Sequence, residues 1–595
     1  MRIIKNLSSF YIPILGMLLI TACSDNFLEQ PAQGSLSNEL VANAEGAQKL
    51  LIGAYGALDG QQDVDNALGG GGPWEAAADN WVYGTVAGGE ASKGSFGGDQ
   101  PAIDQIVKFI SNPSNGFYNT KWKALYEGVV RCNNTLRTLS NVEEISDAER
   151  LDIAAEARFL RGHYYFELKK MFNMVPWVDE TSEDANQPND VDIWPMIEAD
   201  FQFAYDNLPP TQGDFARANK WAAAAYLGKT YLFQEKFAEA REIFNTVITS
   251  GVNSGGTSYD LMPYFKDNFD PATENNSETV FDVQMVANDG TGTITNSRQG
   301  SKLNYPYNSP FRCCGFFQPS QDLMNSFKTD PNTGLPYLEN YNVDPVKNDM
   351  GLGVDDSFTP YTGSLDPRAD WTIGRRGVPY HDWGYHPGAA WVREQSYGGP
   401  YAPKKSIYRQ ATQDIYADQS SWAPGTAINV AIIRFADVLL MAAEAEAQTG
   451  NLGVAMDYVN RVRERAANED GFLKDYIDPS DPMAGFDESK NAANYNIEPY
   501  TMAQFSSQEN ALEAIYFERK LELAMEGHRF FDLVRWGIAE ETLNAYFEYQ
   551  GAITTDVRGG RFISGKNDYY PIPQVQIDLS VGTDGQPLLQ QNPGY

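Results

Sequence analysis

The sequence predicts a mainly α-helical protein, in which a scaffold of tetratricopeptide-like helix pairs carries a long loop-rich insert with short strands. Helical periodicity dominates two blocks, about 40–250 and about 430–550. The stretch between them, about 251–428, is rich in Gly, Pro, Asn and aromatic residues and has many turn signals. Long loop-rich stretches in compact domains are usually functional, so we expect the ligand-facing surface there.

The first residues form a short secretory signal. Basic residues precede an apolar stretch from Phe10 to Ile20, which is shorter than the roughly 20 residues that span a bilayer. Ile20-Thr21-Ala22-Cys23 resembles the bacterial lipobox. We therefore expect residues 1–22 to be a lipoprotein signal peptide and Cys23 to carry the acyl chains that anchor the protein. An ordinary signal peptide followed by an incidental cysteine is the alternative.

The chain is strongly acidic. Its formal net charge is −34 at pH 7, and removal of residues 1–22 takes away Arg2 and Lys5, which lowers the charge to about −36. Such a surface repels the phosphate backbone of nucleic acids and anionic lipid headgroups. We therefore expect no nucleic-acid partner and a ligand that is closer to neutral.

The strongest helical patterns fall within the two periodic blocks. They are Ala148–Phe172, Asn219–Phe233, Ala238–Thr249, Ile432–Gln448, Gly453–Ala467 and Glu509–Met525. In Ile432–Gln448 the apolar residues recur at helical spacing, which predicts one packed face. The same spacing leaves Asp437, Glu444 and Glu446 on the outward side.

Two helix pairs can be compared with the tetratricopeptide pattern, in which small and large residues at fixed offsets let paired helices interlock. The first pair fits well, with Ala224, Leu227, Gly228, Tyr231, Ala240 and Phe244 at the expected positions. The second pair fits in part, because Ala443 and Ala455 supply small contacts while Glu446 stands where an aromatic residue is expected. Generic antiparallel helix packing is the alternative.

The sequence lacks the common catalytic motifs. It contains no Gly-x-Ser-x-Gly elbow, no His-Glu-x-x-His pair and no Cys-x-x-Cys pair. His381 and His386 lie in one loop, but two ligands without a third do not make a metal site. We expect no metal and no cofactor. A glycosidase-like pair of carboxylates stays open, because its geometry is not visible in a sequence.

The cysteines do not predict a disulfide framework. After Cys23 the chain contains Cys132, Cys313 and Cys314, which is an odd number with an adjacent pair. Their spacings match no zinc site.

Aromatic residues concentrate in the second half of the loop-rich stretch. Trp371, Trp383, Trp391 and Trp422 place four of eleven tryptophans within about fifty residues. Flat amphipathic side chains beside hydrogen-bonding groups suit sugar rings, which have apolar faces and polar rims. The candidate ligand-binding residues are Trp371, Tyr380, Trp383, Tyr385, Trp391, Arg393 and Tyr397, with a second patch of Trp74, Trp81 and Tyr83. The alternative is that these rings fill the core of a region with little secondary structure.

Several segments, spread over the whole chain, carry a family resemblance. They are Cys23–Pro31, Glu156–Phe166, Arg434–Ala445 with Asn460–Arg463, Glu518–Gly537, Tyr570–Pro573 and Gln591–Tyr595. In this order they resemble the SusD/RagB family of nutrient-uptake outer-membrane lipoproteins. Within Glu518–Gly537 the charged residues recur mostly every three or four positions, so on a helix they would pair along one face. These charged residues are Glu518, Arg519, Glu526, Arg529 and Asp532.

The resemblance implies a fold and a function. It implies one domain over residues 23–595, anchored by lipid in the outer membrane and exposed at the cell surface. Such a receptor captures oligosaccharide or polysaccharide for a SusC-like TonB-dependent transporter and has no enzymatic activity. Binding of peptides for a similar importer is the alternative, and a glycoside hydrolase is the remote one. Because ligand residues vary with substrate in this family, the aromatic candidates rest on composition alone.

Overall fold

The computed structural model describes residues 42–595 of the chain. The predicted signal peptide and the predicted lipid attachment at Cys23 lie outside the described residues. Within residues 42–595 no helix is both long enough and apolar enough to cross a membrane.

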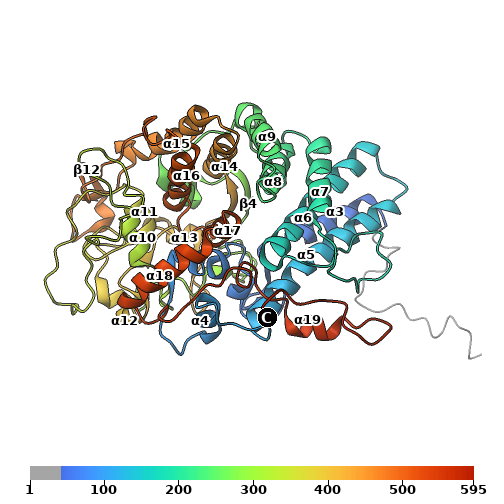
Figure 1. Cartoon of the computed structure of the whole chain (residues 1–595), viewed down its shortest axis with the longest axis horizontal. Helices are drawn as coiled ribbons and strands as arrows, with labels where there is room; N and C mark the ends of the chain where they lie inside the picture. Colours follow the sequence, from blue (N-terminus) through green and yellow to red (C-terminus); the bar gives the residue numbers. More distant parts are fainter. Residues whose placement is uncertain (1–41) are drawn as a thin grey trace, which may run out of the picture.

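Antiparallel helices form a continuous array along one side of the molecule (Figure 1). The first group is α3 (Ala44–Tyr55), α5 (Gly116–Ser140), α6 (Asp147–Phe172), α7 (Trp194–Asn207), α8 (Lys220–Leu232) and α9 (Phe237–Ser250). The second group is α14 (Phe435–Gln448), α15 (Leu452–Ala466) and α16 (Gln508–Glu522). Helix α9 packs directly on α14, so the array continues although the loop-rich stretch separates the two groups in sequence. The prediction of a mainly α-helical repeat scaffold is confirmed.

The pair α8 and α9 shows why small residues recur at fixed positions. Four consecutive alanines, 222–225, are fully buried in α8. A Cβ atom added to Gly228 would lie 2.6 Å from Cε1 of Phe244 in α9. Because that distance is shorter than van der Waals contact, only glycine lets the two helices approach this closely. The side chain of Asn219 starts α8 by accepting hydrogen bonds from Trp221 N and Ala222 N.

Two predictions about the first helix of the second group are wrong. Residues Val430–Arg434 form strand β10, which pairs with β4 (Thr279–Val283), so α14 begins at Phe435. Asp437, Glu444 and Glu446 do not face solvent but are buried. Each of these carboxylates has partners within the protein. Lys229 and Arg519 pair with Asp437, and Arg535 pairs with Glu444. Asn245 and Asn451 donate hydrogen bonds to Glu446.

The segment Glu518–Gly537 is not one helix. Helix α16 ends at Glu522, and α17 (Arg529–Arg535) starts after a turn in which Gly527 has φ +85°. A Cβ atom on Gly527 would lie 2.1 Å from the carbonyl oxygen of Asp79, so the close approach of two backbones requires glycine here.

The ion pairs of this segment connect different parts of the chain instead of following one helix face. Glu518 pairs with Arg368 and Arg463, and Glu522 pairs with Arg368, Arg434 and Arg465. Glu526 pairs with Lys405 and Arg434. Arg519 pairs with Asp437 and Asp532. The network therefore fastens the loop-rich stretch to the second helical group. Arg529 has no ion pair among the described residues.

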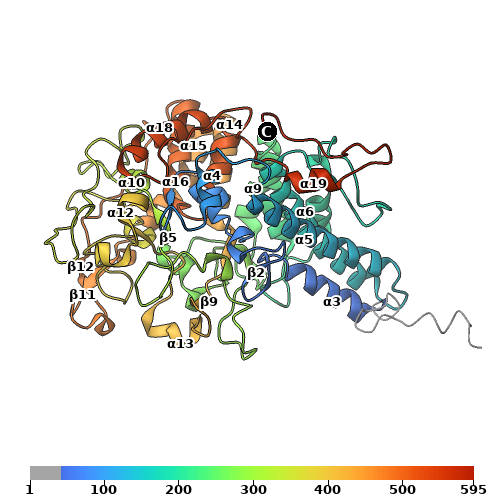
Figure 2. The ribbon, with the colours of Figure 1, turned by 90° about the horizontal axis from the view of Figure 1, so that it is seen from below.

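The loop-rich stretch contains short strands, as predicted, and lies at the opposite end of the molecule from α3, α5 and α6 (Figure 2). Within it β6 (Ile373–Gly374) pairs with β7 (Ala402–Pro403), and β8 (Ala417–Asp418) pairs with β9 (Gly425–Thr426). Its β5 (Phe316–Pro319) pairs with β3 (Ala91–Gly94), which comes earlier in the chain, and the ladder of β11 (Lys474–Tyr476) with β12 (Phe486–Asn491) follows it in sequence. Short helices α10 (Gln321–Ser326), α12 (Gln395–Gly398) and α13 (Gln413–Tyr416) lie among them. Helix α18 (Ala539–Ile553) covers α10, and α19 (Gln574–Leu579) lies near the C-terminus.

Candidate functional site

Many of the predicted aromatic residues gather around one buried ring. Phe311 is fully buried, and its ring centroid lies 4.8 Å from that of Trp383 and 6.4 Å from that of Trp391. The cluster has its own core, separate from the main one, made of Tyr305, Phe311, Tyr380, Ala402, Ile407, Tyr408 and Ala417. Trp383 and Trp391 pack on this core while keeping part of their surface in solvent.

Packing and hydrogen bonds fix the orientation of these two tryptophans. Trp383 Nε1 donates to the carbonyl oxygen of Tyr408 at 2.9 Å. The ring of Trp391 meets the rings of Tyr380 and His386 edge to face, with both centroids 5.5 Å away. Rings held in this way can receive a ligand without losing much side-chain entropy on binding.

Arg393 extends this surface next to Trp391. Its guanidinium carbon lies 4.2 Å from the ring centroid of Phe96 and 5.1 Å from that of Tyr307. Arg393 Nη1 also donates to Ser95 Oγ and pairs with Asp99 Oδ2, both at 2.9 Å. The guanidinium group is therefore held against two rings, and part of it stays accessible. We call Phe96, Asp99, Tyr307, Trp391 and Arg393 the Arg393 surface.

A second exposed aromatic residue lies in the β8–β9 connection. Trp422 is 42% exposed, and its Nε1 donates to Asp65 Oδ1 at 3.0 Å. Lys302 Nζ lies 4.6 Å from the ring centroid and also pairs with Asp65 at 3.0 Å. Burial lowers the pKa of Lys302, against the opposing effect of Asp65. Arg312 Nη1 donates to the carbonyl oxygen of Ser421 at 2.7 Å, which ties this connection to the Phe311 cluster.

Five predicted ligand residues are buried. Trp81, Tyr83, Trp371, Tyr380 and Tyr397 are each at most 7% exposed. The polar atom of each side chain already donates a hydrogen bond within the protein. Trp81 donates to the carbonyl oxygen of Gly300, Tyr83 to that of Phe117, Trp371 to that of Gly471 and Tyr380 to that of Pro403. Tyr397 donates to the carboxylate of Asp104. In this structure these side chains form walls and core, and they do not present their rings to solvent.

The two remaining aromatic candidates, Trp74 and Tyr385, are half-buried. Trp74 packs against the main core, and its Nε1 is buried without a partner among the described residues. The hydroxyl group of Tyr385 donates to Asp475, and its ring meets Tyr476 at 5.2 Å between centroids.

The two loop histidines are buried beside these rings. Burial and the nearby Lys404 lower the pKa of His386 to about 3, and burial, Lys404 and Arg409 lower the pKa of His381 well below its usual value. Both imidazoles are therefore neutral at pH 7. Within residues 42–595 no group of three or more His, Cys, Asp or Glu side chains is arranged to hold a metal ion.

The neighbouring cysteines Cys313 and Cys314 are joined by a disulfide, and Cys132 is free and buried. Because the disulfide links adjacent residues, it closes no chain loop and forms no cross-linked framework. It lies directly after Arg312, whose Nη1 donates to the carbonyl oxygen of Ser421.

Sequence reasoning missed five residues that form or support the exposed surface. Phe96, Asp99, Tyr307 and Asp65, and the buried Lys302 beneath Trp422, come from segments that are distant from the tryptophan-rich stretch in sequence. Each belongs to a loop with no local signal of ligand binding, so only the fold brings it beside Trp391, Arg393 or Trp422.

Sequence comparisons cover most of the chain. Residues 277–595 match the sequence model described as "SusD family", and residues 52–232 match the one described as "Starch-binding associating with outer membrane". A SusD-like protein, P2, from Formosa agariphila is 25% identical over 449 residues, which cover 73% of this chain and 75% of that protein.

Solved structures share the fold. A SusD superfamily protein from Bacteroides vulgatus has a TM-score of 0.66 and 22% identity, and the match covers 93% of this chain and 99% of that one. A surface glycan-binding protein A from Bacteroides thetaiotaomicron, in complex with laminarihexaose, has a TM-score of 0.62 and 20% identity, with coverage of 92% and 99%.

Proposed function

The chain belongs to the SusD family, and from that membership we propose that it is a cell-surface lipoprotein that binds oligosaccharide or polysaccharide. It delivers this ligand to a SusC-like TonB-dependent transporter in the outer membrane, and it catalyses no reaction. The description of the second matched family, which names starch binding and the outer membrane, supports this proposal, as does the laminarihexaose complex of a protein with the same fold.

The observation that carries the glycan proposal is the Arg393 surface with the neighbouring Trp383 and Trp422. It combines partly exposed rings with a fixed guanidinium group and a carboxylate, which is the combination that sugar rings need. A surface of this kind can bind a glycan chain along its length, because it does not enclose the chain ends.

Binding to a panel of neutral polysaccharides tests the proposal directly. We expect affinity electrophoresis of the mature protein to show retardation by at least one of them, with calorimetry giving the affinity for the matching oligosaccharide. If no polysaccharide retards the protein and a peptide panel binds instead, the ligand class is wrong. Release of product from labelled glycan would contradict the absence of catalysis.

Trp391→Ala should weaken glycan binding by about 1–3 kcal/mol, the amount associated with the loss of one stacking aromatic side chain. Calorimetry with the oligosaccharide identified in the panel measures the change. Phe215→Ala is the matched control, since Phe215 is an exposed aromatic residue between α7 and α8 in the other half of the molecule. Unchanged affinity together with an unchanged melting temperature would remove Trp391 from the site.

Cys23→Ala should release the protein from membranes, because the acyl chains of a lipoprotein provide the anchor. Detergent-phase partitioning and membrane fractionation measure this release. Ser24→Ala, next to the attachment position, should leave the protein in the membrane fraction. Retention of the Cys23→Ala variant in the detergent phase would show that something else anchors the chain.

A further inference from the structure

One short segment, residues 311–316, joins the two exposed aromatic areas of the loop-rich stretch. Its Phe311 is fully buried and lies at the centre of the cluster on which the exposed tryptophans pack. The next residue, Arg312, donates from Nη1 to the carbonyl oxygen of Ser421 at 2.7 Å. This hydrogen bond fastens the β8–β9 connection that carries Trp422. The position of the segment therefore affects both areas.

The end of the segment contacts the Arg393 surface directly. A Cβ atom added to Gly315 would lie 3.0 Å from Cβ of Tyr307 and 3.7 Å from Cβ of Arg393. The carbonyl oxygen of Gly315 accepts a hydrogen bond from Ser95 N at 2.6 Å, and Ser95 Oγ accepts one from Arg393 Nη1 at 2.9 Å. A shift of Gly315 would therefore move the groups that hold the guanidinium group of Arg393 in place.

The backbone of the segment has an unfavourable conformation at Arg312. Its φ of +75° lies in the left-handed region, which residues other than glycine adopt only where the surrounding structure holds them. From Phe316 onward the chain is held by the ladder of β5 with β3. Arg312 precedes that ladder, and the disulfide between Cys313 and Cys314 lies between the two. The disulfide therefore stands where the chain leaves the ladder and turns toward the aromatic cluster.

A disulfide between neighbouring residues acts on the local backbone. It closes a small ring that contains the peptide bond between the two cysteines, and this ring restricts rotation about the backbone bonds within it. Cys314 packs in the main core and is 7% exposed, whereas Cys313 is only partly buried. A thiol reductant in solvent therefore approaches the bond from the side of Cys313.

We propose that the Cys313–Cys314 disulfide positions the glycan-binding surface, and that its reduction weakens glycan binding without unfolding the protein. This inference rests on the proposed function and adds to it a dependence on thiol redox state. A dithiol reductant attacks one sulfur as a thiolate, the S–S bond breaks, and both cysteines become thiols. The reductant gives up two electrons and two protons and closes into a cyclic disulfide. The intact bond is the form expected at an oxidising cell surface.

Calorimetry before and after treatment with dithiothreitol tests the proposal, using the oligosaccharide that the oxidised protein binds. We expect the reduced protein to bind about tenfold more weakly, the cost of ordering the backbone of about one residue on binding. Reoxidation should restore the affinity. The melting temperature should stay nearly the same, because the bond closes no long chain loop. Equal affinity of the two forms, or a loss that accompanies unfolding, would overturn the proposal.

The double variant Cys313→Ser with Cys314→Ser keeps side chains of similar size but cannot form the bond. It should bind the oligosaccharide as weakly as the reduced protein does, and dithiothreitol should not change its affinity further. Cys132→Ala is the matched control, because Cys132 is free and buried in α5. This control should keep both the affinity of the natural protein and its response to dithiothreitol. Natural affinity in the double variant would contradict the role of the bond.

Labelling with iodoacetamide establishes the state of the two cysteines. In the unfolded natural protein, mass spectrometry should locate the label on Cys313 and Cys314 only after reduction. Labelling of both without a reductant would overturn the proposal, since no bond would then exist to position the segment.

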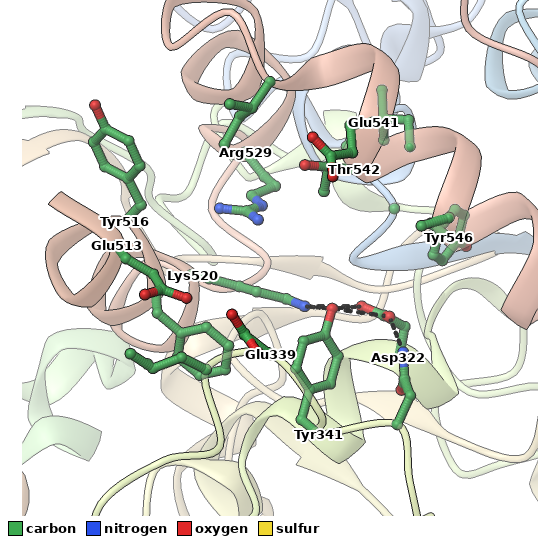
Figure 3. A pocket seen from close by; sticks show the side chains of 18 residues that line it. Asp322, Glu339, Tyr341, Glu513, Tyr516, Lys520, Arg529, Glu541, Thr542 and Tyr546 are labelled. Atoms are coloured by element: carbon green, nitrogen blue, oxygen red, sulfur yellow. Dashed lines mark hydrogen bonds and ion pairs between the residues drawn. The ribbon is translucent and has the colours of Figure 1, made fainter. Parts of the chain in front are cut away.

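Hydrogen exchange provides a measurement that does not depend on glycan. The amides of residues 311–316 should exchange faster after reduction. Residues 338–342 are the internal reference, because they line a separate cavity of about 420 Å³ between α16 and α18 (Figure 3). Lys520 and Tyr341 both contact Asp322 in that wall, at 2.8 and 3.2 Å, and its exchange should not change.

The two measurements distinguish the failure of this inference from the failure of the proposed function. Unchanged exchange of residues 311–316 after reduction would overturn the positioning role, whether or not the protein binds glycan. Faster exchange in a protein whose oxidised form binds no polysaccharide would contradict the proposed function and leave the positioning of the segment supported.

Discussion

Glu522→Gln should lower the free energy of unfolding by about 3–5 kcal/mol, the range for removing one partner of a buried ion pair. Glu522 is fully buried and pairs with Arg368, Arg434 and Arg465. Although burial alone would raise its pKa, these three guanidinium groups hold the pKa of Glu522 well below its usual range. The neutral amide cannot balance their charge. Arg368 belongs to the loop-rich stretch, Arg434 to β10 and Arg465 to α15, and each pairs with Glu522 in α16. Removing the charge of Glu522 therefore weakens the contacts of α16 with all three parts of the chain.

Urea unfolding followed by circular dichroism measures this effect. Glu509→Gln is the matched control, because Glu509 lies in the first turn of the same helix and is exposed. We expect it to change stability by less than about 0.5 kcal/mol. A loss below about 1 kcal/mol for Glu522→Gln would mean that the arginines find other partners, and the network would then not be what holds the two parts together.

Local patterns predicted most of the helical scaffold. The six strongest helices were placed within three residues at each end, because capping residues such as Asn219 and small residues such as Gly228 act through near neighbours in sequence. The burial of Asp437, Glu444 and Glu446 was not predictable in this way. Their partners Lys229, Arg519 and Arg535 come from other helices, and a carboxylate with a distant partner looks like any surface carboxylate in a sequence.

Aromatic composition located the ligand-facing region but could not rank its members. Phe311, which does not stand out in the sequence, organises Trp383 and Trp391, whereas Trp371 and Tyr380 fill the interior. In a region with little secondary structure no periodicity distinguishes the inside from the outside. Contacts between loops that are distant in sequence determine which rings stay exposed, such as the contacts of Arg393 with Phe96 and Tyr307.

The free energy of unfolding should rise by about 2 kcal/mol or more between pH 8 and pH 5.5. Burial raises the pKa of Glu90 and Asp282 to about 7 and that of Glu274 to about 8. In the unfolded chain these groups lose their protons near pH 4. Between pH 4 and pH 8 these three groups therefore bind more protons in the folded state than in the unfolded state, and their contribution to stability falls as pH rises. The buried histidines His163, His381, His386 and His528 have lowered pKa values and act in the opposite direction below about pH 6.5.

The sign reverses at lower pH because paired carboxylates such as Glu522 and Asp437 have lowered pKa values, and their contribution is lost as they become protonated. Urea unfolding at half-unit steps from pH 3.5 to pH 8 should show a maximum between about pH 4.5 and pH 6. The strong net negative charge also favours lower pH, so a variant must separate the two causes. Glu274→Gln keeps an acceptor for Asn429 N but cannot ionise, and it should flatten the slope above pH 6. An unchanged slope would assign the effect to overall charge repulsion instead of to the buried carboxyl groups.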